Sequence, residues 1–270
     1  MFGDSFSMKQ WVLISQLMQA ESLRYIVQSN RRRQFRNCGS IIWQMNEPFP
    51  NASCTSLLSF DGRPKHAYYA VKQAFAGYDV SLVYDSLIHL PGSEKVIKAF
   101  VHIPGESELM GHVQLDLLDI YGHIHFKTEG QTELKGKMSR QVLACSIPYD
   151  PMPQSLYFVR LRLIIQDEKM AEQLYFFTQR QEHDTPLSPL LYLPPSTVQI
   201  QRTSEGYEAR NTGDTVCLFL HAQADKPEAL MSQNYITLFP WDTTVFNPKE
   251  DQSTWHFAAL NDIHVQIIEV

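Results

Sequence analysis

The sequence predicts a mainly β protein, with two immunoglobulin-like β-sandwiches preceded by a helix–strand–helix segment. Three observations predict this fold. Residues 7–30 have a helical apolar period, an apolar run with a second helix signal follows them, and beyond Tyr78 alternating apolar residues recur between turn signals. A chain of 270 residues can hold two to three small domains. We therefore expect domains over residues 1–77, 78–183 and 184–270.

Composition excludes several classes of protein. The net charge of −6, with both signs interspersed, does not indicate a nucleic-acid surface, so we expect no nucleic acid as partner. No stretch reaches the roughly 20 apolar residues of a membrane span, so we expect no membrane contact. No signal peptide precedes the first helix, so we expect a cytoplasmic location, unless a longer protein supplies such a signal. The four cysteines form no C-x-x-C pair, which excludes a zinc ribbon, and we expect no metal and no cofactor.

The first element is a helix with a clear start. Ser7 and Gln10 form a capping box, in which the serine oxygen accepts an early backbone N–H and the glutamine reaches back. An apolar stripe follows at helical spacing, and we expect it to pack against a sheet: Trp11, Ile14, Leu17, Met18, Tyr25 and Ile26.

A buried strand is expected next, over Ile41–Met45, because a continuous apolar run without alternation suits a parallel strand covered on both faces. A long loop over residues 46–62 follows, and a second helix is expected from Pro64 to Phe75, with Phe75 buried. A strand, a loop and a helix make the unit of an α/β barrel, whose catalytic groups lie on the loops after the strands. Residues 1–77 therefore predict a helix–strand–helix unit of this kind, and the resemblance given below implies that it is the remnant of a (β/α)8 barrel.

Two groups of short strands follow, separated by a polar and proline-rich segment over residues 181–195. Seven strands in about a hundred residues are typical of an immunoglobulin-like sandwich. The first group is expected at Val80–Tyr84, Lys95–Ile103, Val113–Ile120, His123–Thr128, Arg140–Ile147, Leu156–Ile165 and Gln173–Thr178. The second group is expected at Val198–Gln201, Tyr207–Asn211, Cys217–Ala222, Tyr235–Leu238, Thr254–Ala258 and His264–Ile268.

Several motifs resemble one family of enzymes. W-Q-M-N-E-P-F-P from Trp43 and S-F-D-G-R-P-K from Ser59 resemble the eighth barrel strand and helix of the β-mannosidases of glycoside hydrolase family two. L-Y-L-P-P-S-T-V from Leu191 and S-Q-N-Y-I-T-L-F-P from Ser232 resemble their terminal immunoglobulin-like domain, although this chain has Gln233 where that family usually has aspartate. The resemblance implies a retaining hydrolase of non-reducing-end β-mannosides, with a β-mannoside or manno-oligosaccharide as substrate.

The resemblance also implies that both catalytic glutamates follow the fourth and seventh barrel strands, and these places would precede Met1. Retaining hydrolysis needs two carboxyl groups about 5–5.5 Å apart. Residues 1–77 contain four acidic residues, and no two of them are expected on adjacent strands: Asp4, Glu21, Glu47 and Asp61. We therefore expect no catalytic residue in this segment, and the chain alone is expected to be inactive.

Three residues are candidates for substrate binding. In the family that the chain resembles, a tryptophan at the place of Trp43 forms a wall of the sugar subsite, because an aromatic ring offers apolar area to a pyranose at low entropic cost. The alternative is an ordinary barrel tryptophan. Asn46 is expected either to bond a sugar hydroxyl or to form its own turn. Glu47 is expected to lie beside substrate or to stabilise the loop, rather than to donate a proton.

Two other functions stay open. A non-catalytic carbohydrate-binding module would present exposed aromatic residues such as Tyr121, Tyr157 or Trp255, and a structural β-sandwich spacer would bind no sugar. His123 and His125 share one strand face, which favours a solvated surface over a metal site because no third ligand is evident. A single barrel strand with two helices exposes edge backbone and apolar helix faces, so we also expect the chain either to pack these faces on its own sandwich or to self-associate.

Overall fold

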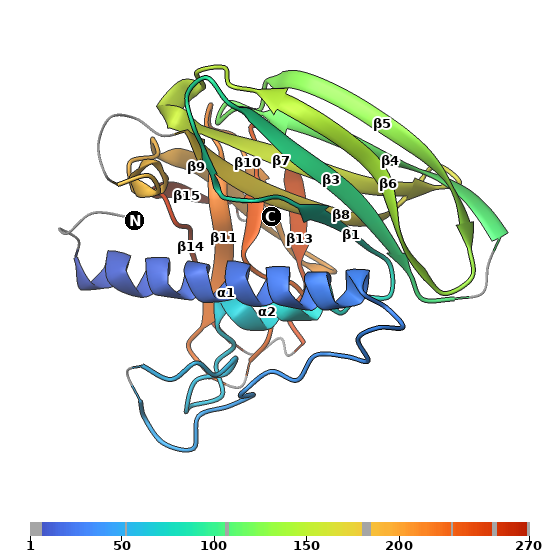
Figure 1. The fold of residues 1–270 in the computed structure, drawn as a ribbon. Helices are drawn as coiled ribbons and strands as arrows, with labels where there is room; N and C mark the ends of the chain where they lie inside the picture. Colours follow the sequence, from blue (N-terminus) through green and yellow to red (C-terminus); the bar gives the residue numbers. More distant parts are fainter. Residues whose placement is uncertain are drawn as a thin grey trace. The chain divides into compact units, whose positions relative to one another are not determined.

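The computed structural model describes residues 7–51, 53–105, 108–179, 185–227, 229–249 and 253–268 (Figure 1). The chain is mainly β, as the sequence predicts, with helices α1 (Met8–Arg32) and α2 (His66–Ala74). It divides into two compact units, of which unit 1 contains Arg24–Ser40 and Lys72–Pro189. Unit 2 contains the described parts of Ser5–Leu23, Ile41–Val71 and Leu190–Val270. Neither described helix is long and apolar enough to cross a membrane.

Unit 1 contains a β-sandwich of two sheets, ordered β1-β3-β6 and β2-β8-β7-β4-β5. The side chains of β3 alternate between buried and less buried, as a strand with one face on a core requires. Core residues such as Leu82, Val101, Leu161 and Phe177 come from both sheets. Its strands are β1 (Asp79–Val83), β2 (Ile88–His89), β3 (Glu94–Ile103), β4 (Glu108–Leu118), β5 (Ile124–Lys135), β6 (Met138–Pro148), β7 (Leu156–Ile165) and β8 (Glu168–Gln179), with a 3-10 turn η1 (Pro153–Ser155) before β7.

The order of these strands has the crossovers of an immunoglobulin-like fold. The chain passes from one sheet to the other between β1, which pairs antiparallel with β3, and β2, which pairs parallel with β8. It changes sheet again from β2 to β3, from β3 to β4, from β5 to β6, which pairs with β3, and from β6 to β7. These crossovers place sequence neighbours in opposite sheets, so the core is closed by contacts that are distant in sequence.

Unit 2 contains a smaller sandwich, with sheets ordered β13-β10-β9-β15 and β12-β11-β14. The last strand, β15, runs parallel to β9. Val198, Leu220 and Phe246 lie in the core between the two sheets. The strands are β9 (Ser196–Thr203), β10 (Gly206–Asn211), β11 (Cys217–Ala224), β12 (Ile236–Leu238), β13 (Thr243–Phe246), β14 (Trp255–Ala258) and β15 (Ile263–Ile268), and a 3-10 turn η2 (Ser188–Leu191) precedes them.

Helix α1 begins as the sequence predicts. The Ser7 hydroxyl accepts a hydrogen bond from the Gln10 backbone N–H at 3.3 Å, and the side-chain Oε1 of Gln10 accepts one from the Ser7 N–H at 3.0 Å. Leu17 is buried, but the expected burial of Trp11 and Ile26 is wrong, because their side chains are 56 % and 49 % exposed. Phe75 is also exposed, and it lies one residue beyond α2. A helical period thus predicts which side chains lie on one face of the helix. It does not predict along how much of that face another element packs.

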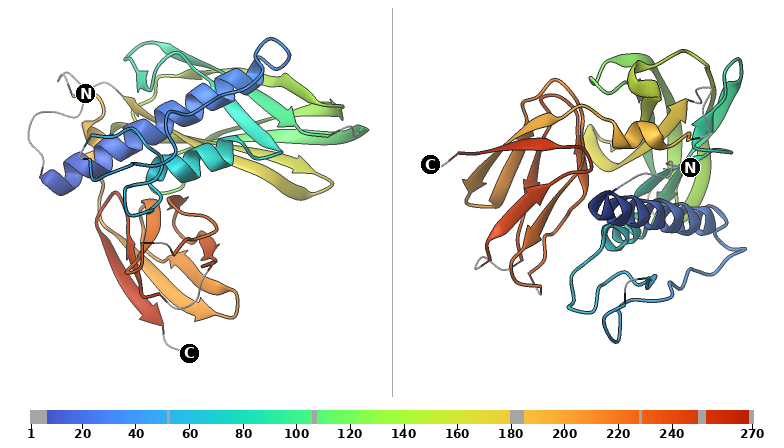
Figure 2. Two further views of the ribbon diagram at one scale, coloured as in Figure 1. Left: turned by 90° about the horizontal axis from the view of Figure 1, so that it is seen from below. Right: turned by 90° about the vertical axis from the view of Figure 1, so that its left-hand side faces the viewer.

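The expected strand over Ile41–Met45 is absent. Ile41 is 97 % exposed, and Figure 2 shows this stretch without a strand arrow. A parallel strand needs neighbours that pair with its N–H and C=O groups, and no described strand runs beside this stretch. The backbone bonds within its own loop instead: the carbonyl of Met45 accepts from the N–H of Leu58 at 2.7 Å. The assignment of residues 1–77 to a barrel stays a prediction.

Candidate functional site

Trp43 lies in this loop segment with its side chain 82 % exposed. The backbone around it is fixed: the Trp43 carbonyl accepts a hydrogen bond from the Thr55 hydroxyl at 3.3 Å, and the next carbonyl, of Gln44, accepts from the Leu57 N–H at 3.0 Å. The indole is therefore presented on an ordered loop without a covering element among the described residues. An exposed aromatic ring on a fixed backbone can stack against an apolar ligand face.

Glu47 has a different environment from Trp43, because its side chain is buried within the loop. Its carboxylate forms an ion pair with Lys65 and accepts a hydrogen bond from the Ser56 hydroxyl at 2.9 Å. Lys65 also donates to the Cys54 carbonyl at 3.2 Å. The hydrogen bond from Lys65 lowers the pKa of Glu47. A carboxylate held ionised in this way is unsuited to donate a proton, and it fixes the loop to the residue just before α2.

Asn46 is exposed, and its side-chain amide lies 3.5 Å from the Glu47 carbonyl. The structure thus places all three predicted residues on one loop, with Trp43 and Asn46 exposed and Glu47 buried. Their role in substrate binding stays a prediction. Lys65 was not among the predicted site residues, although it lies in the R-P-K motif. Its ion pair joins residues 18 apart, for which the sequence gives no local signal.

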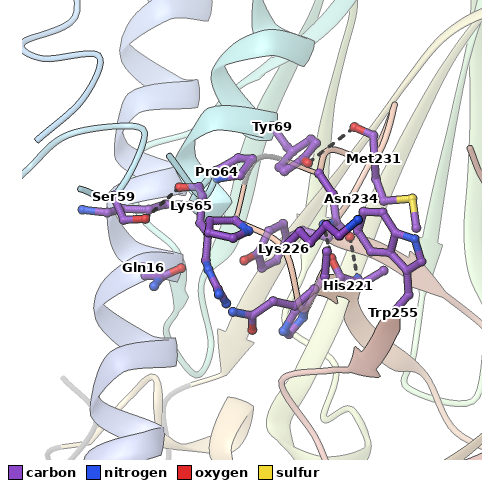
Figure 3. A pocket seen from close by; sticks show the side chains of 17 residues that line it. Gln16, Ser59, Pro64, Lys65, Tyr69, His221, Lys226, Met231, Asn234 and Trp255 are labelled. Atoms are coloured by element: carbon purple, nitrogen blue, oxygen red, sulfur yellow. Dashed lines mark hydrogen bonds between the residues drawn. The ribbon is translucent and has the colours of Figure 1, made fainter. Parts of the chain in front are cut away.

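A pocket of about 190 Å³ opens in unit 2 (Figure 3). One side is formed by Gln16 of α1, by the end of the loop at Lys65, and by Tyr69 of α2. The other side comes from the sandwich and includes Lys226 and Trp255. Figure 3 shows these side chains converging on one space from segments that are far apart in the sequence.

An aromatic stack forms one wall of this pocket. The Tyr235 ring lies between His66 of α2, at 4.3 Å between ring centroids, and His221 of β11, at 4.7 Å. The interplanar angles of 11° and 14° show that the three rings are nearly parallel. Burial lowers the pKa of His221, so its imidazole is neutral at neutral pH. The stack holds the start of α2 against the sandwich, and its Tyr235 and His221 rings line the pocket.

Among the described residues, no group of three or more His, Cys, Asp or Glu side chains is arranged to hold a metal ion. His123 and His125 both contact one oxygen of the buried Asp119, at 3.1 and 2.9 Å. The sequence analysis did not anticipate that carboxylate beside them. Asp119 also accepts the backbone N–H groups of Tyr121 and His123, so the cluster shapes the turn between β4 and β5.

Solved structures share this fold. The β-D-mannosidase from Dictyoglomus thermophilum matches 99 % of the chain with a TM-score of 0.73 and 18 % identity. An exo-chitosanase of Amycolatopsis orientalis, in complex with PNP-β-D-glucosamine, matches 97 % of the chain with a TM-score of 0.68 and 16 % identity. No protein-family profile matches the chain, and no curated protein matches it.

The chain therefore has the fold of a segment of solved glycosidases. More particularly, the chain shares the fold of a segment of the β-D-mannosidase, as the sequence motifs predict. It spans about a third of these solved structures, 31 % of the mannosidase and 35 % of the exo-chitosanase. At these identities the similarity establishes the fold alone.

Proposed function

We propose that the chain is the C-terminal portion of a β-mannosidase-like retaining glycoside hydrolase that acts on non-reducing-end β-mannosides. The observation that carries the proposal is the fold match over 99 % of the chain to a β-D-mannosidase, combined with the W-Q-M-N-E-P-F-P motif on an exposed loop. The sequence motifs and the fold both favour the same class of enzyme.

In this proposal Trp43 supplies one wall of the sugar subsite. Its indole is exposed on an ordered loop, as a ring must be to stack on the apolar C–H face of a pyranose. Asn46 is exposed beside it and offers an amide to a sugar hydroxyl. Glu47 holds the loop through Lys65, so that its contribution to substrate binding is to position Trp43 and Asn46.

The segment supplies no acid–base pair in this proposal. Glu47 is paired with Lys65, and Asp61 is paired with Arg63 at 2.8 Å. Glu21 is buried on α1. Retaining hydrolysis needs a nucleophile and a separate proton donor on opposite sides of the scissile bond. The catalytic glutamates would belong to a barrel encoded ahead of this segment, and a cytoplasmic location of the whole protein stays a prediction.

The reading frame ahead of Met1 tests the parentage. We expect it to encode further barrel strands, with a glutamate after the fourth and another after the seventh. In a protein assembled from both parts, Trp43→Ala should weaken binding of a β-mannoside, whereas Trp241→Ala, which removes another exposed indole of unit 2, should not. An upstream frame without barrel strands would overturn the proposal.

A second candidate function is a non-catalytic carbohydrate-binding module. It is favoured by an open groove of about 670 Å³ on unit 2, lined by Tyr207, Trp255 and Phe257. The sequence analysis named Tyr157 for such a role, but that is wrong, because Tyr157 is buried in the core of unit 1. Titration with manno-oligosaccharides separates the two functions. Loss of binding in Tyr207→Ala, and not in Trp43→Ala, would favour the module.

A further inference from the structure

The pocket of unit 2 differs in charge from the rest of the chain. The whole chain has a net charge of −6, yet the described residues that line the pocket include three cationic side chains and no aspartate or glutamate. The three cations are Arg63, Lys65 and Lys226. A cavity lined by one sign of charge raises the local concentration of the opposite ion. The lining therefore favours an anionic ligand.

The three cations differ in whether a carboxylate already neutralises them. Arg63 pairs with Asp61, and Lys65 pairs with Glu47. For Lys226, the described residues provide no ion pair, and its hydrogen bonds with them involve its backbone alone: its N–H donates to Asp225, and its carbonyl accepts from the Ala229 N–H. Figure 3 shows the Lys226 side chain extending through the pocket toward Asn234 and Trp255. Its ammonium group is thus the donor that remains available to a ligand.

The walls of the pocket indicate what carries the negative charge. Tyr69, Tyr235 and Trp255 give aromatic surface, and the amides of Gln16 and Gln223 lie at the lining. The Asn234 amide is already used, because it bonds both the N–H and the carbonyl of Ala222 at 2.8 Å. A cavity of about 150 Å³ holds one benzene molecule. The 190 Å³ of this pocket therefore admits one six-membered ring with its substituents.

We propose that this pocket binds a monosaccharide that carries one anionic group, a carboxylate or a phosphate. The anionic group pairs with Lys226, the apolar face of the ring packs on the aromatic wall, and the ring hydroxyls bond the free glutamine amides at the lining. Charge-assisted hydrogen bonds are about twice as strong as neutral ones, so the anion is the main determinant of affinity. The site uses neither Trp43 nor Asn46, and it does not depend on the function proposed above.

Isothermal titration of the whole 270-residue chain tests this site. The probes are D-glucuronate and D-glucose 6-phosphate, compared with neutral D-glucose, with acetate and with inorganic phosphate. We expect saturable binding of one of the two anionic sugars per chain, at least about tenfold tighter than D-glucose, as one charge-assisted hydrogen bond implies. Whichever anionic sugar binds identifies the carboxylate or the phosphate as the source of the charge. Higher salt should weaken this binding, because a partly exposed ion pair is screened.

The matched variants are Lys226→Gln and Lys249→Gln, which remove one exposed lysine each from unit 2, with only Lys226 at the pocket. We expect about tenfold weaker binding in Lys226→Gln and no change in Lys249→Gln. Thermal melting of both variants shows whether the fold is retained. Equal binding of D-glucose, equal binding of acetate or phosphate without a ring, or equal loss in both variants would overturn the proposal. Its failure would leave the mannosidase-like parentage untouched, since that rests on the loop and the fold.

Discussion

The two units hold the helical segment by unlike contacts. In unit 1, the C-terminal half of α1 packs on the sandwich through buried polar groups, whereas in unit 2 the start of α2 packs through stacked rings. The polar groups around Asp79 in unit 1 bond to one another, and those around the pocket of unit 2 leave Lys226 without an ion pair among the described residues. The difference indicates where a ligand can bind. A network whose polar groups all bond to one another stabilises the fold, whereas a polar group without a protein partner can bind a ligand.

The network of unit 1 is centred on the buried Asp79. Its carboxylate accepts from the Gln173 amide at 2.9 Å and from the Gln28 amide at 3.3 Å, with Arg31 at 3.8 Å. The Tyr175 hydroxyl donates to Gln28 at 2.8 Å and accepts from the Leu82 N–H at 3.1 Å. Each member is held by at least one other, so the network fixes the helix without offering a donor to a ligand.

The largest effect is expected from the ring at the centre of the stack in unit 2. Tyr235→Ala removes the ring between His66 and His221, and leaves a cavity between α2 and the sandwich. We expect a loss of about 3 kcal/mol in the free energy of unfolding, as for other large aromatic deletions. Urea denaturation measures it. Tyr235→Phe keeps the ring and should cost less than about 1 kcal/mol; an equal loss in both variants would show that the hydroxyl, and not stacking, holds α2.

The next effect concerns the network of unit 1. Asp79→Ala leaves the amides of Gln28 and Gln173 without their buried acceptor, and should cost about 2 kcal/mol. Asp79→Asn keeps an acceptor oxygen and should cost less. The two variants can be compared by urea denaturation at pH 7. If Asp79→Ala is neutral, the polar network does not hold α1.

The two units should also differ in the sign of their pH dependence. Burial raises the pKa of Asp79 to about 6, so the folded state holds this proton more tightly than the unfolded state does. Its contribution to stability is therefore present at acidic pH and falls as the pH rises from about 4 through about 6. Asp79→Asn, which does not titrate, should remove that slope. A slope unchanged in Asp79→Asn would contradict the assignment.

His221 should give the opposite slope. Burial lowers its pKa, and it faces Tyr235, with the positive charge of Lys9 adding to the effect. The unfolded state takes up the proton near the ordinary pKa of about 6.5, so stability should fall as the pH falls below that value. His221→Phe keeps a stacked ring and should flatten the acidic loss. His102 of unit 1 also has a lowered pKa, of about 4, so the comparison is made between variants and not between whole curves.

The smallest effect on stability is expected at Trp43. Its side chain is 82 % exposed, so Trp43→Ser should change the free energy of unfolding by less than about 0.5 kcal/mol. Exposed apolar residues at Ile41, Trp43 and Met45 should nevertheless promote self-association at high concentration. Light scattering of the variant and of the original chain tests this. If the variant and the original chain associate equally, the indole of Trp43 does not contribute to the contact between chains.

The sandwiches could be predicted closely because strand signals are local. The expected strand over Leu156–Ile165 has the same bounds as β7, and Lys95–Ile103 differs from β3 by one residue. The sequence analysis missed β2 and β13, which are two and four residues long and have little room for alternation. The stretch Ile41–Met45 had the pattern of a buried strand, but a parallel strand depends on partners that no local pattern reveals.

The candidate site was predictable only in part. Trp43, Asn46 and Glu47 lie in one motif, and its resemblance to a known family was enough to predict them as site residues. The pocket of unit 2 brings Gln16 together with Lys226 and Trp255, from which most of the chain separates it, and no short motif joins them. The pairing of Glu47 with Lys65, which removes this glutamate from consideration as a proton donor, likewise depends on how the loop folds.

An activity assay tests the central claim, that this chain holds a sugar-facing loop without the chemistry of hydrolysis. The 270-residue chain is incubated with a chromogenic β-mannoside, beside the variant Glu47→Gln. We expect no turnover above the uncatalysed rate for either protein. Turnover by the original chain that Glu47→Gln abolishes would contradict the account, because it would make the carboxylate paired with Lys65 a catalytic group.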